Sequence, residues 1–174
     1  MAPDNPIVRD LVIPLKDFPH LYQDQTLHDA VAVLLSYTCG EYNRIRYADI
    51  LVLNERNQLC GRVTLQDILI SLDPRFKEAS KVSGFEGKGA ELFNLITLWE
   101  DSFFVECTKW SHIPIKNLMS PIKYTVKGSD PALKALVIMI STKIAVLPAV
   151  DEGRVLGVIR LKEIFRAITE KCRI

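Results

Sequence analysis

Several features that would point to a particular class of protein are scarce in this sequence of 174 residues. Positive and negative charges almost cancel, with 22 Lys and Arg against 21 Asp and Glu, and the basic residues are scattered. This balance predicts no nucleic-acid partner and no attraction to a membrane surface. Long apolar runs are missing, and the first residues lack a basic segment followed by an apolar one. We therefore expect a soluble, intracellular protein with no membrane segment.

Cysteine and histidine are also scarce, and their spacing excludes several chemistries. There are four cysteines and three histidines. The cysteines stand far apart with no CxxC pair, which argues against a zinc site or a disulfide framework and favours reduced thiols in the cytoplasm. The histidines share no metal-ligand spacing, and there is no Gly-x-Ser-x-Gly or Cys–His arrangement. We predict no metal, no catalytic cofactor and no enzymatic activity. The residues concerned are Cys39, Cys60, Cys107 and Cys172, and His20, His28 and His112.

What the sequence does contain is one local pattern that occurs twice. Residues 59–69 and 155–165 each read as the end of a strand, a sharp join and the first turns of a helix. Aligning the two copies matches Gly61 with Gly157, Thr64 with Arg160 and Asp67 with Glu163. The first copy keeps a hydroxyl at the helix start and the second has lost it, so we expect the two copies to differ in function.

The elements around these stretches also repeat, which predicts a duplicated unit of about a hundred residues. Each copy should hold a helix, a hairpin of apolar strands and a final helix, in a mixed α/β (α+β) fold. We expect residues 1–9 to be a loose arm and residues 36–49 to be the end of a helix followed by a loop. The expected helices are 26–35, 65–72, 132–140 and 161–172, and the expected strands are 50–53, 59–63, 146–150 and 155–159. The predicted units are 8–72, a joiner at 73–117 with a helix at about 90–107, and 118–171.

At these residues the sequence resembles a tandem pair of cystathionine-β-synthase (CBS) domains, also called a Bateman module. Met119-Ser-Pro121 and residues 147–151 are similar to sequence motifs that are common in that family. The resemblance implies two small sheets with flanking helices, packed with pseudo-two-fold symmetry around two clefts. It also implies regulatory binding of an adenine nucleotide or nucleoside, of the AMP, ADP, ATP or S-adenosylmethionine class, and pairing into a homodimer.

The candidate site in the first copy rests on Thr64 and Asp67. A helix N-terminus offers free N–H groups to a phosphate, and the hydroxyl of Thr64 lies beside them. The carboxylate of Asp67 only accepts hydrogen bonds, so it could hold both hydroxyls of a ribose. A simpler role also explains the pair, because Thr64 and Asp67 form a capping-box relative worth about 1 kcal/mol. By the resemblance, the adenine lies against Tyr124, Thr125 and Val126, and Arg46, Lys123 or Lys127 could balance phosphate charge.

The candidate site in the second copy is weaker. Arg160 has no acceptor and cannot cap the helix, although it could grip a phosphate. Glu163 could hold a ribose, but an ion pair between these two side chains is the simpler account. In this copy the residues expected beside the adenine are His20 and Leu21, which correspond to the segment at Tyr124 in the first site. His20 is more typical of a packed loop residue than of a ligand contact.

These observations predict a non-catalytic sensor that binds an adenine nucleotide and signals to a partner protein whose identity the sequence does not give. The alternative is a degenerate pair that serves only as a structural dimerisation module. A small enzyme is a third possibility, which the lack of an assembled acid, base or nucleophile argues against. In the joiner, Trp99 and Phe103 fall at helical spacing, and we expect these aromatic residues to be covered by the protein body or by a second copy.

Overall fold

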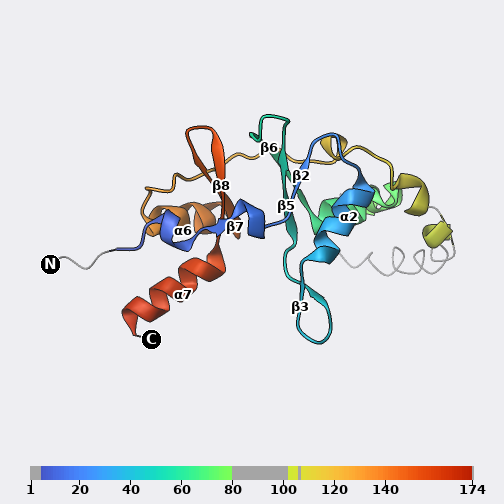
Figure 1. Cartoon of the computed structure of the whole chain (residues 1–174). Helices are drawn as coiled ribbons and strands as arrows, with labels where there is room; N and C mark the ends of the chain where they lie inside the picture. The colour runs from blue at the N-terminus through green and yellow to red at the C-terminus, as the bar shows by residue number, and fades with distance from the viewer. Residues whose placement is uncertain (1–4, 80–101, 106, 174) are drawn as a thin grey trace.

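The computed structural model describes residues 5–79, 102–105 and 107–173, which form two halves side by side (Figure 1). Each half has a three-stranded sheet with helices packed against it, so the chain has the expected α/β fold. The elements up to residue 79 are α1 (Val8–Leu11), β1 (Ile13–Pro14), η1 (Leu15–Asp17), β2 (His20–Tyr22), α2 (Leu27–Ser36), β3 (Thr38–Cys39), β4 (Arg44–Ile45), β5 (Asp49–Leu53), β6 (Leu59–Thr64), α3 (Leu65–Ser71) and α4 (Pro74–Ala79). Those after residue 106 are η2 (Cys107–Trp110), η3 (Ile115–Asn117), α6 (Ala132–Thr142), β7 (Val146–Asp151), β8 (Arg154–Arg160) and α7 (Leu161–Cys172).

The two sheets are built on one plan. In the first half the strand order is β2-β5-β6, with β2 parallel and β6 antiparallel to the central β5. In the second half the order is β1-β8-β7, and a parallel bridge from Val126 to Ala149 takes the place that β2 holds in the first sheet. Residues 50–53 of β5 are buried, as expected for an apolar central strand. The register makes Asp49 the partner of Thr64 and Val146 the partner of Arg160, so these two pairs are equivalent.

Each half completes its sheet with a segment from the other half. Strand β1 precedes the first sheet in sequence but pairs with β8 of the second, Ile13 with Val158 and Pro14 with Gly157. The converse contact joins Ser120 to Arg62 on the edge of the first sheet, with backbone bonds of 3.0 and 2.8 Å. The two halves are therefore held together by the short segments near the start of each unit, and residues of these segments line the cavities between the halves.

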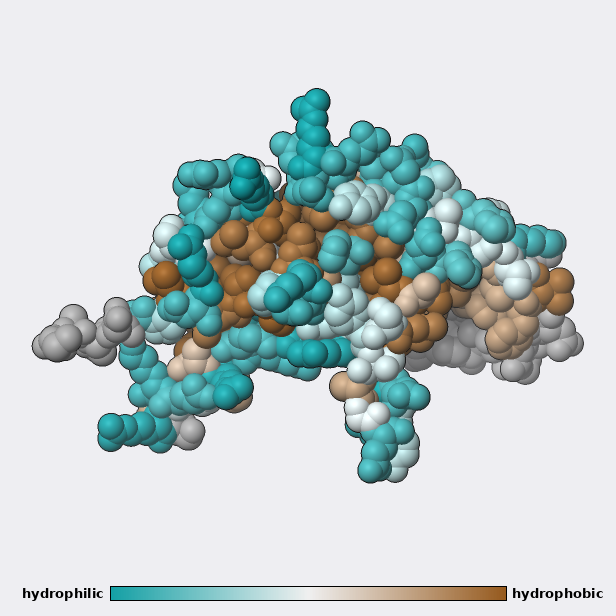
Figure 2. Space-filling view, in the orientation of Figure 1, coloured by the Kyte–Doolittle hydropathy of each residue, from teal (hydrophilic) through white to brown (hydrophobic). Residues whose placement is uncertain are grey.

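The hydrophobic core follows the same exchange. Val8 of α1 is fully buried among residues of the second half, whereas Ile115 of η3 is fully buried among residues of the first. A third cluster, built on Phe18, Tyr47 and Val158, lies between the halves. Hydrophobic residues gather around the middle of the face shown in Figure 2. Burial of apolar side chains on both sides of the junction stabilises the relative placement of the two repeats.

Most of the local predictions are confirmed, and two are wrong. The hairpin β5–β6, the turn between its strands and the helices at residues 27–36, 65–71, 132–142 and 161–172 lie where the sequence placed them. The expected loose arm at 1–9 is wrong at its end, because Val8 begins α1 and its N–H bonds to the carbonyl of Asp130 at 2.8 Å. The expected loop at 36–49 contains a second hairpin, β3–β4, that projects from the body (Figure 1). Short-range patterns do not reveal the long-range partner that orders Val8.

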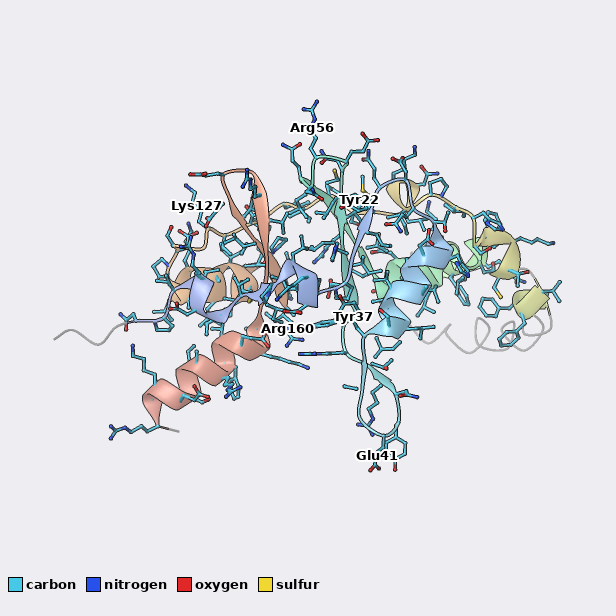
Figure 3. All side chains as sticks on the ribbon, in the orientation of Figure 1. Tyr22, Tyr37, Glu41, Arg56, Lys127 and Arg160 are labelled. Atoms are coloured by element: carbon cyan, nitrogen blue, oxygen red, sulfur yellow. The ribbon has the colours of Figure 1, made fainter. Side chains whose placement is uncertain are left out.

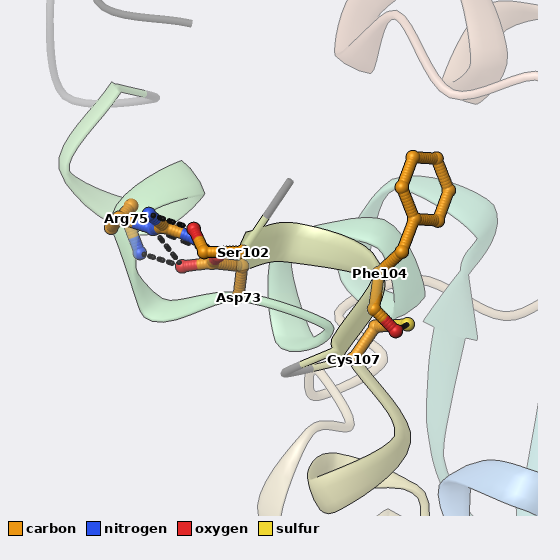
Figure 4. A network of polar contacts seen from close by, with 5 residues as sticks. All are labelled: Asp73, Arg75, Ser102, Phe104 and Cys107. Atoms are coloured by element: carbon orange, nitrogen blue, oxygen red, sulfur yellow. Dashed lines mark hydrogen bonds and ion pairs between the residues drawn. The ribbon is translucent and has the colours of Figure 1, made fainter. Parts of the chain in front are cut away.

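The start of the joiner is held by hydrogen bonds to Asp73 and Ser102. Asp73 is buried, and Arg75 donates two hydrogen bonds from Nε to its carboxylate at 2.9 and 2.8 Å and one from Nη1 to Ser102 at 3.1 Å (Figure 4). These bonds to Arg75 hold the pKa of Asp73 below its usual value despite burial. Residues 102–105 are helical, and the rest of the predicted helix at about 90–107 lies largely outside the described residues, as does Trp99.

Candidate functional site

The first cleft is a cavity of about 650 Å³ between the two halves. The first half contributes residues of β5 and β6, and the second half contributes the crossing segment 120–124, the end of α6 and the start of β7. The cavity is therefore formed only when both repeats are packed together. Its polar lining residues are Asp49, Arg62, Ser120, Lys123, Tyr124, Ser141 and Thr142.

Thr64 and Asp67 form a complete capping box at the start of α3, next to the first cleft. Oδ2 of Asp67 accepts bonds from the N–H of Thr64 at 2.8 Å and from its hydroxyl at 2.7 Å, and the N–H of Asp67 donates to that hydroxyl at 3.1 Å. The predicted capping role is confirmed. Neither residue lines the cavity itself, but Asp49, the ladder partner of Thr64, does. Among the described residues none donates to Oδ1 of Asp67, so one carboxylate oxygen stays available for a ligand.

The capping box also limits what Thr64 can do for a ligand. Its hydroxyl hydrogen points to Asp67, so it cannot at the same time donate to a phosphate. At the end of the cleft near α3, the carboxylate of Asp49 lines the cavity, and that of Asp67 lies behind it, bonded to Thr64, the ladder partner of Asp49. Burial raises the pKa of Asp49, the charge of Asp67 raises it further, and Arg62, 3.9 Å away, opposes both effects only in part. This end of the cleft is better suited to hydroxyl groups than to phosphate oxygens.

The three residues expected beside the adenine are placed differently from one another. Tyr124 lines the first cleft and is 42% exposed. Thr125 is exposed but does not line the cavity. Val126 is buried, and its backbone is engaged with β7, since its N–H donates to Pro148 at 3.0 Å and its carbonyl accepts from Val150 at 2.8 Å. Of the three, Tyr124 is the residue that the structure brings to the cavity.

The second cleft is a cavity of about 630 Å³ on the pseudo-symmetric side of the molecule. It lies between the crossing segment 10–17, the base of the β3–β4 hairpin and α7. Figure 3 shows Tyr37 at the base of this hairpin, with Arg160 at the start of α7 nearby and Glu41 at the far tip of the hairpin. Charged residues of both signs line it, namely Asp10, Lys16, Asp17, Arg46, Glu163, Arg166 and Glu170.

Arg160 and Glu163 are paired with each other. Nε of Arg160 donates to Oε2 of Glu163 at 2.8 Å, and Nη2 of Arg160 donates to Oε1. Burial raises the pKa of Glu163, but the hydrogen bonds and charge of Arg160 outweigh it, so the pKa lies below the usual value. No side chain caps α7, as predicted for an arginine at this position. Both oxygens of Glu163 are thus occupied, in contrast to Asp67.

The residues predicted to contact a ligand at the second site, His20 and Leu21, line neither cleft. His20 lies in β2, where its Nδ1 donates to the carbonyl of Phe18 at 2.9 Å. Leu21 is 2% exposed and belongs to the core of the first half. A ligand in the second cleft would instead meet the crossing segment 10–17 and α7.

The three basic residues expected to balance phosphate charge lie in different parts of the molecule. Lys123 lines the first cleft, whereas Arg46 lines both the second cleft and a third cavity of about 500 Å³. The guanidinium groups of Arg46 and Arg160 each lie 5.2 Å from the centre of the buried Tyr47 ring, within the range of cation–π attraction. Lys127 lines none of the three cavities. The third cavity adjoins the first at Asp49 and Val146, which line both.

Sequence reasoning missed Asp49 and Arg62 as cleft residues. Both are charged residues of otherwise largely apolar strands, since Asp49 begins β5 and Arg62 lies within β6 between Gly61 and Val63. A charged residue inside an otherwise apolar strand is the signal that could have found them.

No group of three or more His, Cys, Asp or Glu side chains in the described part of the chain could hold a metal ion. Likewise, no described helix has the length and apolar character needed to cross a membrane.

Two α/β repeats that exchange their leading segments and enclose a cleft on each side define a paired repeat module. The model of the CBS domain family matches residues 8–73 and 115–170, which is more than half of the sequence. The chain belongs to the CBS domain family, and the two matched regions make it a tandem pair. No curated protein matches the sequence.

Solved structures share this fold at low sequence identity. The CBS-pair protein CBSX2 of Arabidopsis thaliana has a TM-score of 0.65 and 18% identity, over 98% of this chain and 99% of that one. A structure of CBSX2 in complex with AMP has a TM-score of 0.63 and 19% identity, over 96% and 98% of the two chains. The cytosolic domain of the Mg²⁺ channel MgtE in complex with ATP has a TM-score of 0.58 and 16% identity, over 90% and 46%.

Proposed function

We propose that the chain is a non-catalytic sensor that binds an adenine nucleotide or nucleoside between its two CBS repeats. The observation that supports this proposal is a cavity of about 650 Å³ built from both repeats and lined by Asp49, the ladder partner of Thr64, whose capping box with Asp67 leaves Oδ1 of Asp67 without a donor among the described residues. A carboxylate oxygen can accept hydrogen bonds from the adjacent hydroxyls of a ribose. Two structures with the same fold were solved with AMP and with ATP, which supports a ligand of this class.

Within this proposal the first cleft is the main site. Asp67 holds the ribose, Tyr124 offers its ring to the adenine, and Thr64 fixes Asp67 through the capping box rather than by touching the ligand. Thr125 and Val126 follow Tyr124 on the same segment, and Val126 joins this segment to β7 through its bridge to Ala149. Binding in the second cleft at Arg160, Glu163, His20 and Leu21 is the weaker proposal, because the ion pair between Arg160 and Glu163 must open before Glu163 can accept from a ribose.

A sensor requires that the ligand favour one packing of the repeats over another. The first cleft is lined by both halves, so a bound ligand contacts both and changes the free energy of their packing. The size of the response is limited by the difference in ligand affinity between the two packings. We propose that a partner protein in the cytoplasm reads this change. A reducing compartment agrees with the four free cysteines.

The first test is a thermal denaturation screen with AMP, ADP, ATP, S-adenosylmethionine, NAD and adenosine. A ligand present at a hundred times its dissociation constant should stabilise the fold by about 2.7 kcal/mol, which raises the melting temperature by several degrees. Guanosine and GTP serve as matched controls for the sugar and phosphates. A panel in which no adenine compound shifts the melting temperature would favour the rival, a structural module without ligand. The ion pair in which Arg160 donates to both oxygens of Glu163 favours that rival, because it leaves Glu163 no free oxygen for a ribose.

We also propose that the protein is a homodimer that uses the outer face of α6. Leu133, Val137 and Ile140 lie on one side of this helix at i, i+4 and i+7, and they are 61%, 62% and 66% exposed. A row of exposed aliphatic residues on one helix face is typical of an interface.

Val137→Glu tests this interface. Sedimentation velocity should show a dimer for the wild type and a monomer for the variant, because a charge buried without a partner destabilises an interface. Arg56→Gln, in the exposed turn between β5 and β6, is a control that changes the net charge by the same amount away from α6. A Val137→Glu protein with the oligomeric state of the wild type would contradict the proposed face.

A further inference from the structure

Asp49 stands at the junction of two cavities. It begins β5 and pairs across the sheet with Thr64, and it lines both the first cleft and the third cavity. The third cavity holds cationic side chains at Arg46, Arg160 and Lys162, beyond the carboxylate. A ligand that binds at Asp67 and extends toward these cations must pass beside Asp49.

The fold gives Asp49 little reason to carry a charge. Its carboxylate has no hydrogen-bond donor within the described chain, and its ion partner Arg62 lies at 3.9 Å, near the outer limit of a salt bridge. The side chain is 21% exposed, and burial raises its pKa. The equivalent residue in the second half is Val146, so the strand that occupies this place in the second sheet begins without a carboxylate. The negative charge of Asp49 is disfavoured by burial and makes no hydrogen bond within the described chain, so it is available to interact with a ligand.

Resting on the proposed function, we propose that Asp49 selects the charge of the ligand in the first cleft, favouring adenosine derivatives with a neutral or cationic 5′ substituent over those with a phosphate. Asp49 pairs across the sheet with Thr64, and Thr64 bonds through its N–H and its hydroxyl to Oδ2 of Asp67, so the two carboxylates lie near each other. A ribose held by Asp67 therefore brings its 5′ substituent within reach of both carboxylates. A 5′ phosphate carries a charge between about −1.5 and −2 at pH 7, so it is repelled there, while a sulfonium group is attracted.

The test compares the affinities of adenosine, S-adenosylmethionine and AMP by isothermal titration calorimetry at low salt. The wild type should bind adenosine and S-adenosylmethionine more tightly than AMP. Asp49→Asn should shift the ratio of the AMP to the adenosine dissociation constant by roughly tenfold in favour of AMP, the scale of one charge removed from a partly buried site. Asp49→Val, which copies the equivalent Val146 of the second half, should shift the same ratio and provides a second variant if the asparagine protein folds poorly.

Asp24→Asn is the matched control, because it removes an equally negative charge from an exposed ion pair with Lys116 outside the cavities. It should leave the ratio of the two affinities as in the wild type. The inference is overturned if both Asp49 variants bind adenosine but keep the wild-type ratio, or if the control shifts the ratio as much. Absence of binding by any adenine compound would instead overturn the proposed function itself, so the two failures are distinguishable.

Discussion

Asp67→Ala is expected to remove the response of the protein to adenine compounds. Hydrogen bonds to a charged group contribute about 1.5–3 kcal/mol each, so losing both ribose hydroxyls should weaken binding at least about a hundredfold. At a ligand concentration that stabilises the wild type by about 2.7 kcal/mol, the variant should show almost no change in melting temperature. The measurement is a thermal denaturation series with and without the ligand that the wild type prefers.

The chain supplies a close control for this variant. Asp29 forms the same capping box with Thr26 at the start of α2, with Oδ2 accepting from the N–H of Thr26 at 2.8 Å and from its hydroxyl at 2.9 Å. Asp29→Ala should therefore cost about the same stability as Asp67→Ala, on the order of 1 kcal/mol, through the loss of a cap. Only Asp67→Ala should lose the ligand. Equal ligand-induced stabilisation of both variants would mean that the binding site lies elsewhere.

The second large effect concerns the exchange of segments between the halves. Gly157 has φ of +152°, and a Cβ at this position would lie 1.9 Å from the carbonyl oxygen of Ile13 on β1. Gly157→Ala must therefore open the β1–β8 pairing or move α1 out of the second core. We expect a loss of about 3 kcal/mol or more in the free energy of unfolding, measured by urea denaturation.

Gly153 is the control for backbone strain alone. It lies in the β7–β8 turn with φ of +78°, and a Cβ there would meet no atom within 4 Å. Gly153→Ala should cost only about 1 kcal/mol, the usual penalty for a side chain in the left-handed region. If the two alanine variants lose the same stability, the close approach of β1 to β8 does not hold the halves together.

The sequence was informative where a signal is local. The spacing of Leu27, Ala30 and Leu34 predicts α2, and the polar turn between two apolar runs predicts the β5–β6 hairpin; both are confirmed. Matching Thr64 with Arg160 and Asp67 with Glu163 places both pairs correctly at helix starts. These features depend on neighbours within a few residues, which is why pattern alone reveals them.

The rest depends on partners far along the chain. Val8 bonds to the carbonyl of Asp130, and Ser120 bonds to the edge of β6 at Arg62. The local sequence around Val8 or Ser120 does not predict such a contact. The same limit applies to the candidate site. Its two-sided geometry makes Asp49 a cleft residue and takes the backbone of Val126 into a bridge with β7, and both facts follow only from the register of the strands.

A crystal structure of the protein with saturating adenosine tests the central claim most directly. We predict adenosine in the first cleft, with both ribose hydroxyls within hydrogen-bond distance of Oδ1 of Asp67 and the base against the ring of Tyr124. Adenosine bound in the second cleft, with the pair between Arg160 and Glu163 broken and Asp67 untouched, would contradict this claim.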